Sequence, residues 1–139
     1  MAKVLVPLAD GCEELEAVTV IDLLRRAQIE VVSAGLTSGP VKGSRGTVLL
    51  PDCTLDAALK QDYDMIVLPG GQPGATNLEQ DTRILALLKN MTAAGKFTAA
   101  ICAAPRVLAV AGLLDGKRAT CYPGTLDTQL FPAIRLETQ

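Results

Sequence analysis

Short apolar runs that alternate with a helical segment restrict the fold of this chain more than any other feature. Lys3–Ala9 (KVLVPLA) is apolar and ends at Asp10-Gly11, and Glu13–Arg26 has helical periodicity with acids first and arginines last. That order of charges suits the dipole of a helix. Ile29–Ala34 (IEVVSA) is again typical of a strand, so residues 3–34 predict one βαβ unit.

The alternation continues beyond this unit. A hairpin or edge excursion is expected at Pro40–Leu50, strands at Asp64–Leu68, Phe97–Ile101 and weakly at Arg118–Cys121, and helices at Leu55–Lys60, Asp81–Ala94 and Ala103–Ala111. Gly95 is expected to end the second of these helices, since glycine tolerates the positive φ found there. The pattern predicts an α/β fold in which helices cover both faces of a mainly parallel sheet. At 139 residues the chain fits one domain, 1–139.

Composition argues against several classes of function. The net charge is −2 with no basic cluster, which does not favour nucleic-acid binding. No apolar run reaches the roughly 18–20 residues that span a bilayer, and Val4–Ala9 is too short for the core of a signal peptide. We therefore predict a cytoplasmic protein with no membrane partner.

Cofactor and metal sites have no support in the sequence either. Neither a GxGxxG nor a GxxxxGK[ST] pattern is present. The chain has no histidine, and its four cysteines are widely spaced, so a zinc or iron site would need cysteine and carboxylate ligands alone. We predict free thiols in a reducing compartment, no metal and no cofactor.

Three unusual stretches follow predicted strands, at the edge of the sheet where ligands bind in such folds. They are Asp10–Glu16, Pro69–Gly74 and Cys102. Cys102 lies where the Phe97–Ile101 strand, expected to be buried, should turn sharply into a helix among small residues. That arrangement resembles the strained turn that presents a nucleophile in α/β enzymes. The alternative is a cysteine that only packs in the core.

A reactive Cys102 needs help to ionise, because a free thiol has a pKa of about 8.5. Without histidine, the sources of help are the helix start that follows it and a protonated carboxyl group that donates to the thiolate. The candidate carboxyl groups are Glu13, Glu14 and Glu16, of which the first and last share a helix face. Pro69–Gly71 could offer main-chain N–H groups to an oxyanion. The alternatives are a solvated helix start and a plain turn that ends a strand.

Four motifs occur together in order: GCEELEAV at Gly11–Val18, IDLLRRA at Ile21–Ala27, YDMIVLPGG at Tyr63–Gly71 and AAICAAP at Ala99–Pro105. In combination they resemble the ThiJ/PfpI family, in the branch of the Parkinson-disease-associated protein deglycase and its bacterial relatives. The likeness extends from Met1 to about Thr125. It implies a flavodoxin-like α/β sandwich and a homodimer.

The resemblance also implies roles for individual residues. Cys102 matches the oxidisable nucleophile of the family, and Glu16 matches the protonated partner of that thiol. Gly71 and Ala103 match the positions whose main-chain N–H groups form the oxyanion pocket.

Further residues are assigned outside this centre. Arg45 in GSRG resembles the arginine that reaches the site of the neighbouring subunit, and Leu15 lies where that interface packs. Cys53 is a candidate for a redox role near a sheet edge, and Cys12 is a second oxidisable candidate. Cys121 is expected to pack.

The chain departs from the family pattern at two positions near the cysteine. Tyr122 stands where some members carry a histidine, so a catalytic histidine is ruled out. Ala103 stands where the protease-like branch has a histidine, which disfavours proteolysis. Related glutamine amidotransferases need a downstream His and Glu pair that is also missing.

The family normally continues for a few more strands and a closing helix, with a Gly-rich SRGPGT-like stretch that this sequence lacks. Leu126–Gln139 shows neither a helical nor an alternating pattern, and its Leu130, Phe131 and Ile134 would need cover. The chain could be naturally short, truncated, or cleaved from a C-terminal part that is now a separate fragment. We favour truncation or cleavage, because an uncovered sheet face costs about 25 cal/mol per Å² of apolar surface.

The sequence therefore leads to a hypothesis of a cofactor-independent glyoxalase or protein deglycase. Its substrate would be an α-oxoaldehyde, or the early adduct of one with a protein or nucleotide, attacked by the Cys102 thiolate. The alternative is an oxidative-stress sensor or redox-regulated chaperone in which Cys102 is oxidised. Both use the same residues, so the sequence does not separate them.

Overall fold

The protein is described here by a computed structural model that covers residues 1–138. Gln139, the last residue of the predicted domain, lies outside the described residues. The elements follow in the order β1 (Lys3–Leu8), α1 (Glu14–Arg26), β2 (Glu30–Gly35), β3 (Val41–Lys42), β4 (Val48–Leu49), β5 (Cys53–Thr54), α2 (Leu55–Ala58), β6 (Met65–Leu68), α3 (Gly74–Glu79), α4 (Thr82–Ala93), β7 (Phe97–Ala100), α5 (Pro105–Val110), β8 (Arg118–Ala119) and β9 (Arg135–Leu136).

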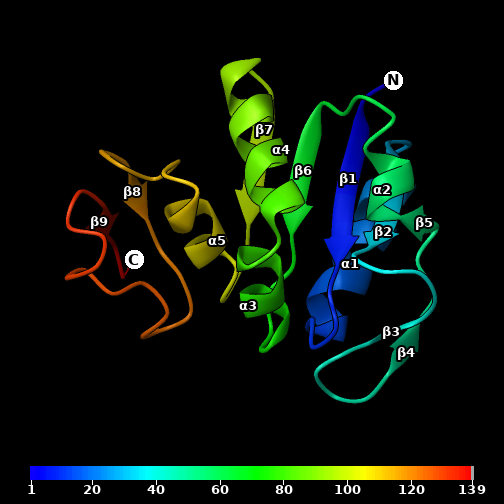
Figure 1. Ribbon diagram of the computed structural model, residues 1–139, viewed down its shortest axis with the longest axis horizontal. Helices are drawn as coiled ribbons and strands as arrows, with labels where there is room; N and C mark the ends of the chain where they lie inside the picture. The colour runs from blue at the N-terminus through cyan, green and yellow to red at the C-terminus, as the bar shows by residue number, and fades with distance from the viewer. Residues whose placement is uncertain (139) are drawn as a thin grey trace.

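A five-stranded parallel sheet forms the centre, with the order β5-β2-β1-β6-β7. β1 and β2 are in register from Lys3 opposite Glu30 to Leu8 opposite Gly35. The predicted α/β fold with a mainly parallel sheet is confirmed. β3 and β4 form the expected antiparallel hairpin beside this sheet. β8 and β9 pair with each other beyond α5, to the left in Figure 1.

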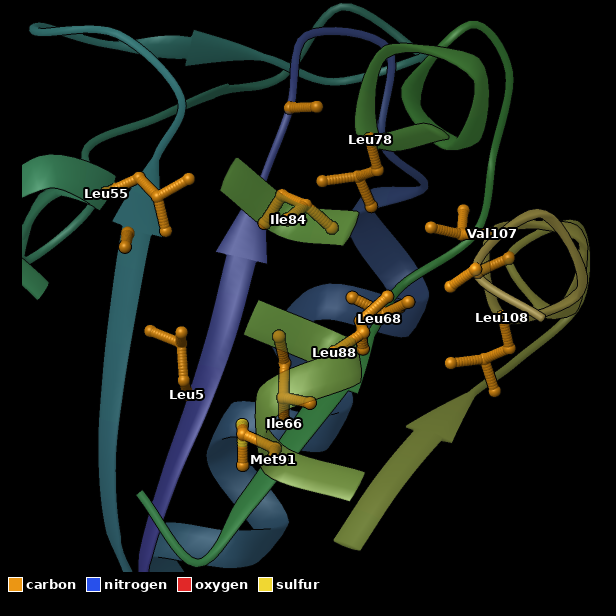
Figure 2. Packing of buried hydrophobic residues seen from close by; sticks show 14 of the residues in the cluster. Leu5, Leu55, Ile66, Leu68, Leu78, Ile84, Leu88, Met91, Val107 and Leu108 are labelled. Carbon is orange, nitrogen blue, oxygen red and sulfur yellow. The ribbon is translucent and has the colours of Figure 1, made fainter. Parts of the chain in front are cut away.

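The two faces of the sheet bury alternate residues of each strand, as the period of a strand requires. Val4 and Val6 of β1 face α1 and its Ile21. Leu5 of β1 and Ile66 of β6 point to the other face, where α2, α3, α4 and α5 pack. Figure 2 shows the second face, with Leu5 and Ile66 near the α4 side chains Ile84, Leu88 and Met91. Helices therefore lie on both faces, as expected.

The helices end where the local chemistry predicts. Glu13 caps α1, because its carboxylate accepts from the main-chain N–H of Leu15 at 3.5 Å, and Arg25 and Arg26 occupy the last turn. α4 is followed by Gly95 with a φ of +76°, as expected for a residue after a helix. α3 was not expected, since its six residues, GATNLE, carry no helical periodicity.

The expectation that the Phe97–Ile101 strand is buried is wrong. β7 is the edge of the sheet, bonded on one side to β6 alone, and Phe97 is 71% exposed. Phe97 lies opposite Met65 of β6, and Ala99 of the same strand packs on the α1 side of the sheet. α1 covers β1 and β2 better than it covers β7, so an apolar sequence here does not produce a buried strand.

The segment after Leu126 is more ordered than its sequence pattern suggested. β9 pairs in parallel with β8, and Leu126 and Ile134 are buried against Ala109 of α5. Leu130, which was expected to need cover, is 63% exposed. That the whole of 1–139 is a single domain lacking C-terminal strands and a closing helix stays a prediction.

Candidate active site at the carboxyl ends of β1, β6 and β7

The three stretches singled out in the sequence converge at one end of the sheet. The N–H of Glu13, after β1, donates to the carbonyl of Gly70, after β6, at 2.9 Å. The N–H of Ile101, after β7, donates to the carbonyl of Leu68 at 3.2 Å. Parallel strands place these loops side by side, which is why residues far apart in the sequence meet here.

Cys102 adopts a backbone conformation that few residues other than glycine adopt. Its φ is +61°, and only one other non-glycine residue of the described chain, Gln28, has a positive φ. This left-handed conformation costs about 1–2 kcal/mol for a residue with a side chain. The turn between β7 and α5 is therefore strained, as expected from its resemblance to the turn that presents a nucleophile in α/β enzymes. Strain of this kind concentrates at functional sites.

Glu16 lies below Cys102 and is fixed by the main chain. The N–H of Gly70 donates to Oε1 of Glu16 at 2.9 Å, and the Glu16 carboxylate is close enough to the Cys102 thiol to raise its pKa. A Cβ at position 70 would come within 2.7 Å of that carboxylate oxygen and 2.8 Å of the Ile101 carbonyl. Only glycine lets the main chain approach so closely. Gly70 lies in the Pro69–Gly71 stretch, a candidate source of N–H groups for an oxyanion, but its bond to Glu16 was missed.

The electrostatics of the cysteine differ from the sequence-based expectation. Burial raises the pKa of the Cys102 thiol, and the negative charge of Glu16 and its hydrogen bond to the thiol raise that pKa further. The N–H of Ala103 acts in the opposite direction. α5 begins only at Pro105, so its first turn does not supply the expected set of N–H groups to the sulfur.

The two predicted oxyanion positions border the same pocket as Cys102. Gly71 and Ala103 both line it, and the N–H of Ala103 faces the sulfur. Within residues 1–138, the N–H of Gly71 donates to no main-chain or side-chain acceptor. The structure thus brings Cys102, Glu16, Gly71 and Ala103 together at one place.

This pocket, which we call the Cys102 pocket, has a volume of about 470 Å³ and opens to solvent. Glu13, Ser44 and Arg45 form one wall, and Tyr122–Thr125 form another. The second wall is held in place by the N–H of Tyr122, which donates to the carbonyl of Cys102 at 2.7 Å. The resemblance places Tyr122 near the cysteine, but Pro123, Gly124 and Thr125 were missed, because no local pattern places them beside a residue more than twenty positions earlier.

Arg45 lies on the wall of the pocket in its own chain. The notion that it reaches a neighbouring subunit stays a prediction. Its loop, Gly43–Thr47, which we call the Arg45 loop, connects β3 and β4 and is bound by Glu14. Glu14 thus points away from Cys102, whereas Glu16 points toward it, as the helix spacing predicted.

The other cysteines do not line the Cys102 pocket. Cys12 is 1% exposed, and burial raises the pKa of its thiol to about 11. Cys53 is half-buried at the β5 edge, where burial and Asp52 raise its thiol pKa. Cys121 packs against the Leu126 and Ile134 cluster, as expected. Redox roles for Cys12 and Cys53 stay predictions.

No group of three His, Cys, Asp or Glu side chains in the described chain is arranged to hold a metal ion. Among residues 1–138, no helix combines the length and the apolar character that a bilayer crossing requires.

The sheet order and the strained cysteine turn define an α/β protein with a candidate nucleophile at the carboxyl ends of its strands. The chain belongs to the DJ-1/PfpI family, whose model matches residues 2–133. It is 44% identical over 120 residues to protein dj-1beta of Drosophila melanogaster, covering 86% of this chain and 64% of that protein. It is 36% identical to the glutathione-independent glyoxalase DJR-1.2 of Caenorhabditis elegans, covering 87% of this chain and 63% of the relative.

Solved structures agree with this assignment. The crystal structure of Drosophila DJ-1beta matches with a TM-score of 0.92 at 40% identity, over 99% of this chain and 74% of that one. Oxidised Toxoplasma gondii DJ-1 matches with a TM-score of 0.87 at 42% identity, over 93% and 73% of the two chains. The chain thus spans slightly less than two thirds of the two relatives compared above.

Proposed function

We propose that this protein is a cofactor-independent enzyme of the glyoxalase or deglycase type, with Cys102 as its nucleophile. Its substrates are α-oxoaldehydes or their early adducts with proteins or nucleotides. The observation that carries the proposal is the position of Cys102: a strained turn presents its thiol to an open pocket while Glu16 contacts it from below. A relative that is 36% identical is named a glutathione-independent glyoxalase, which supports this class of activity.

The raised pKa of the Cys102 thiol suggests a role for Glu16 as the base that removes the thiol proton. Glu16 accepts the thiol proton as the sulfur of Cys102 attacks the aldehyde carbon, and a hemithioacetal forms. The N–H groups of Gly71 and Ala103 stabilise the negative charge on the former carbonyl oxygen.

The remaining steps turn this adduct into product without an external oxidant. Glu16 returns its proton to the oxyanion, and the former aldehyde carbon then loses its proton while the neighbouring carbonyl oxygen takes one up, which gives an enediol. The hydroxyl on the sulfur-bearing carbon next loses its proton as the neighbouring carbon takes one up. The result is a thioester of a 2-hydroxyacid. Water cleaves the thioester, releasing lactate from methylglyoxal or glycolate from glyoxal, and Cys102 regains its proton.

The proposal is tested by measuring lactate formed from methylglyoxal by the purified chain and its variants. Cys102→Ala is expected to abolish lactate formation, and Glu16→Gln to reduce it by about 10²- to 10⁴-fold, the usual contribution of a general acid or base. Cys121→Ala, which alters a packing cysteine, is the matched control. Full activity of Cys102→Ala would refute the proposal.

A second candidate function is an oxidative-stress sensor or redox-regulated chaperone. The N–H of Ala103 faces the sulfur, and the same donor would stabilise the oxygen atoms of a Cys102 sulfinate. A gain of two oxygen atoms at Cys102 after mild peroxide, without turnover of methylglyoxal, would favour the sensor. Turnover without oxidation would favour the enzyme.

The homodimer expected from the family is also a proposal, and it places Leu15 in the interface. Leu15 is 73% exposed on α1, as is usual for an apolar side chain that a partner covers. Leu15→Asp is expected to lower the molar mass measured by light scattering from that of a dimer to that of a monomer. Leu23→Asp is the control, since Leu23 is 58% exposed on the same helix. A cytoplasmic location and a separate C-terminal fragment stay predictions.

A further inference from the structure

The guanidinium group of Arg45 has no partner within residues 1–138. None of the ion pairs in the described chain involves it, and none of the side-chain hydrogen bonds uses its guanidinium nitrogens; only its main-chain N–H is bonded. Arg25, Arg26, Arg83, Arg106 and Arg118, in contrast, each pair with a carboxylate. A free guanidinium on the wall of a pocket retains its full capacity for a bidentate contact with an anion.

The backbone that carries Arg45 is nevertheless firmly held. The carboxylate of Glu14 accepts from the main-chain N–H of Arg45 at 3.1 Å and from that of Thr47 at 3.0 Å. The N–H of Ser44 donates to the carbonyl of Cys12 at 2.8 Å, and the N–H of Gly43 donates to the carbonyl of Thr47 at 2.8 Å. The Arg45 loop therefore fixes the origin of the side chain, so the main chain needs no ordering when the guanidinium binds a ligand.

The other charged groups around the pocket are already engaged. Glu13 caps α1 through the N–H of Leu15 and accepts from the Ser44 hydroxyl at 3.3 Å. Glu16 accepts from Gly70 and contacts the thiol beneath the pocket floor. Among the described residues that line the pocket, Arg45 is the one cation.

We propose that Arg45 makes the Cys102 pocket selective for aldehydes that carry a carboxylate, by binding that group while Cys102 attacks the aldehyde carbon. This proposal rests on the proposed function and narrows its substrate class. A pocket of about 470 Å³ accommodates a chain of several carbon atoms between the two groups, whereas methylglyoxal fills only a small part of it. A neutral α-oxoaldehyde can react, but it leaves the guanidinium unused.

The first test needs no turnover and uses two thiol reagents of similar size. Iodoacetate is an anion and iodoacetamide is neutral, and both alkylate the sulfur with loss of iodide. Rates at Cys102 are followed by peptide mass spectrometry. Arg45→Met is expected to lower the ratio of the iodoacetate rate to the iodoacetamide rate by about three- to tenfold, the effect of one charge about 4 Å away at the dielectric of water. Lys60→Met, which removes an exposed cation outside the pocket, is the control.

Salt provides a second reading of the same experiment. Raising the ionic strength to about 1 M shortens the Debye length to roughly 3 Å, so the wild-type ratio is expected to fall toward that of Arg45→Met. A ratio that Arg45→Met leaves unchanged, or changes no more than Lys60→Met does, would overturn the proposal.

The second test compares 4,5-dioxopentanoate, an α-oxoaldehyde with a terminal carboxylate, with its methyl ester. The wild type is expected to show a KM about tenfold lower for the acid, and Arg45→Met is expected to remove the difference by raising the KM for the acid. Equal KM values in the wild type would overturn the proposal. If neither compound nor methylglyoxal is turned over, the proposed function fails, and the alkylation ratio alone decides whether Arg45 selects anions.

Discussion

Cys102 is the residue in which the fold and the chemistry meet. Its φ of +61° places the thiol over the pocket. This left-handed conformation costs free energy that an extended strand conformation does not cost. The cost is borne by contacts on both sides: the N–H of Ile101 is bonded to β6, and the carbonyl of Cys102 is bonded to Tyr122. A position kept under strain in this way indicates that exposure of the sulfur, rather than packing, determines the local backbone.

We predict that glycine at this position stabilises the chain relative to alanine. Cys102→Gly and Cys102→Ala both remove the thiol, but only glycine adopts a positive φ without steric cost. The free energy of unfolding of Cys102→Gly should therefore exceed that of Cys102→Ala by about 1 kcal/mol in urea titrations. The entropic penalty of glycine, roughly 0.5–1 kcal/mol, is smaller than the steric cost of about 1–2 kcal/mol, so an alanine variant more stable than the glycine variant would show that the turn relaxes in solution.

The charge of Glu16 affects the pH at which the Cys102 thiol ionises. Its negative charge is one cause of the raised pKa of the Cys102 thiol, after burial. Glu16→Gln removes the charge, so the thiol should ionise at lower pH than in the wild type. The pH dependence of the rate at which iodoacetamide alkylates Cys102 gives the midpoint of thiol ionisation in the wild type and in Glu16→Gln. A midpoint that rises in Glu16→Gln would mean that a protonated Glu16 assists the thiolate, as the sequence first suggested.

Among the elements, the β3–β4 hairpin and α1 form a unit through Glu14. Desolvation acts to raise the pKa of this carboxyl group, but hydrogen bonds from its own main-chain N–H and from those of Thr47 and Arg45 outweigh it and lower the pKa from about 4.5 to about 2. A carboxyl group with a lowered pKa in the folded state stabilises that state above its unfolded pKa. The contribution is therefore complete above about pH 4.5 and is lost as the pH falls toward 2.

This linkage predicts how acid affects the hairpin. Between pH 4.5 and 2, the melting temperature of Glu14→Gln should change less with pH than that of the wild type, because the variant has no proton to take up at this site. Asp115→Asn, which alters an exposed acid in a turn, is the control and should follow the wild type. Parallel curves for Glu14→Gln and the wild type would contradict the prediction.

The elements that the sequence predicted well are those whose pattern is local. The βαβ unit, the hairpin, the α4 helix with Gly95 after it, and the strained turn at Cys102 all depend on residues adjacent in the chain. The pairing of Glu16 with Gly70, the wall formed by Tyr122–Thr125 and the exposure of β7 depend on which segments meet in space. No local pattern carries that information, because an apolar strand has the same sequence pattern at the edge of a sheet as at its centre.

At the scale of the molecule, the open edge of the sheet carries exposed apolar side chains. Phe97 is 71% exposed and Ile101 is 45% exposed, beside a β7 backbone that has no strand on its outer side. Exposed edge strands with apolar side chains pair with other chains unless they are covered or charged.

We predict that this edge promotes association as the concentration rises. Phe97→Lys should lower the apparent mass that sedimentation measures at high concentration, because a lysine at an edge opposes pairing. Leu130→Lys is the matched control, since Leu130 is 63% exposed in the segment before β9. If both variants associate as the wild type does, the contact between chains lies elsewhere.

The place of β7 also links reactivity to local fraying. Cys102 follows closely after β7, a strand that is hydrogen-bonded to another strand, β6, along one edge only. Breaking of the pairing between β6 and β7 would free the turn at Cys102 without unfolding the centre of the sheet, since β1 keeps neighbouring strands on both sides. Amide protons of Thr98–Ala100 should thus exchange with deuterium sooner than those of Leu5 and Val6 in β1. Any molecule that pairs with β7 should slow this exchange and lower the reactivity of Cys102 together.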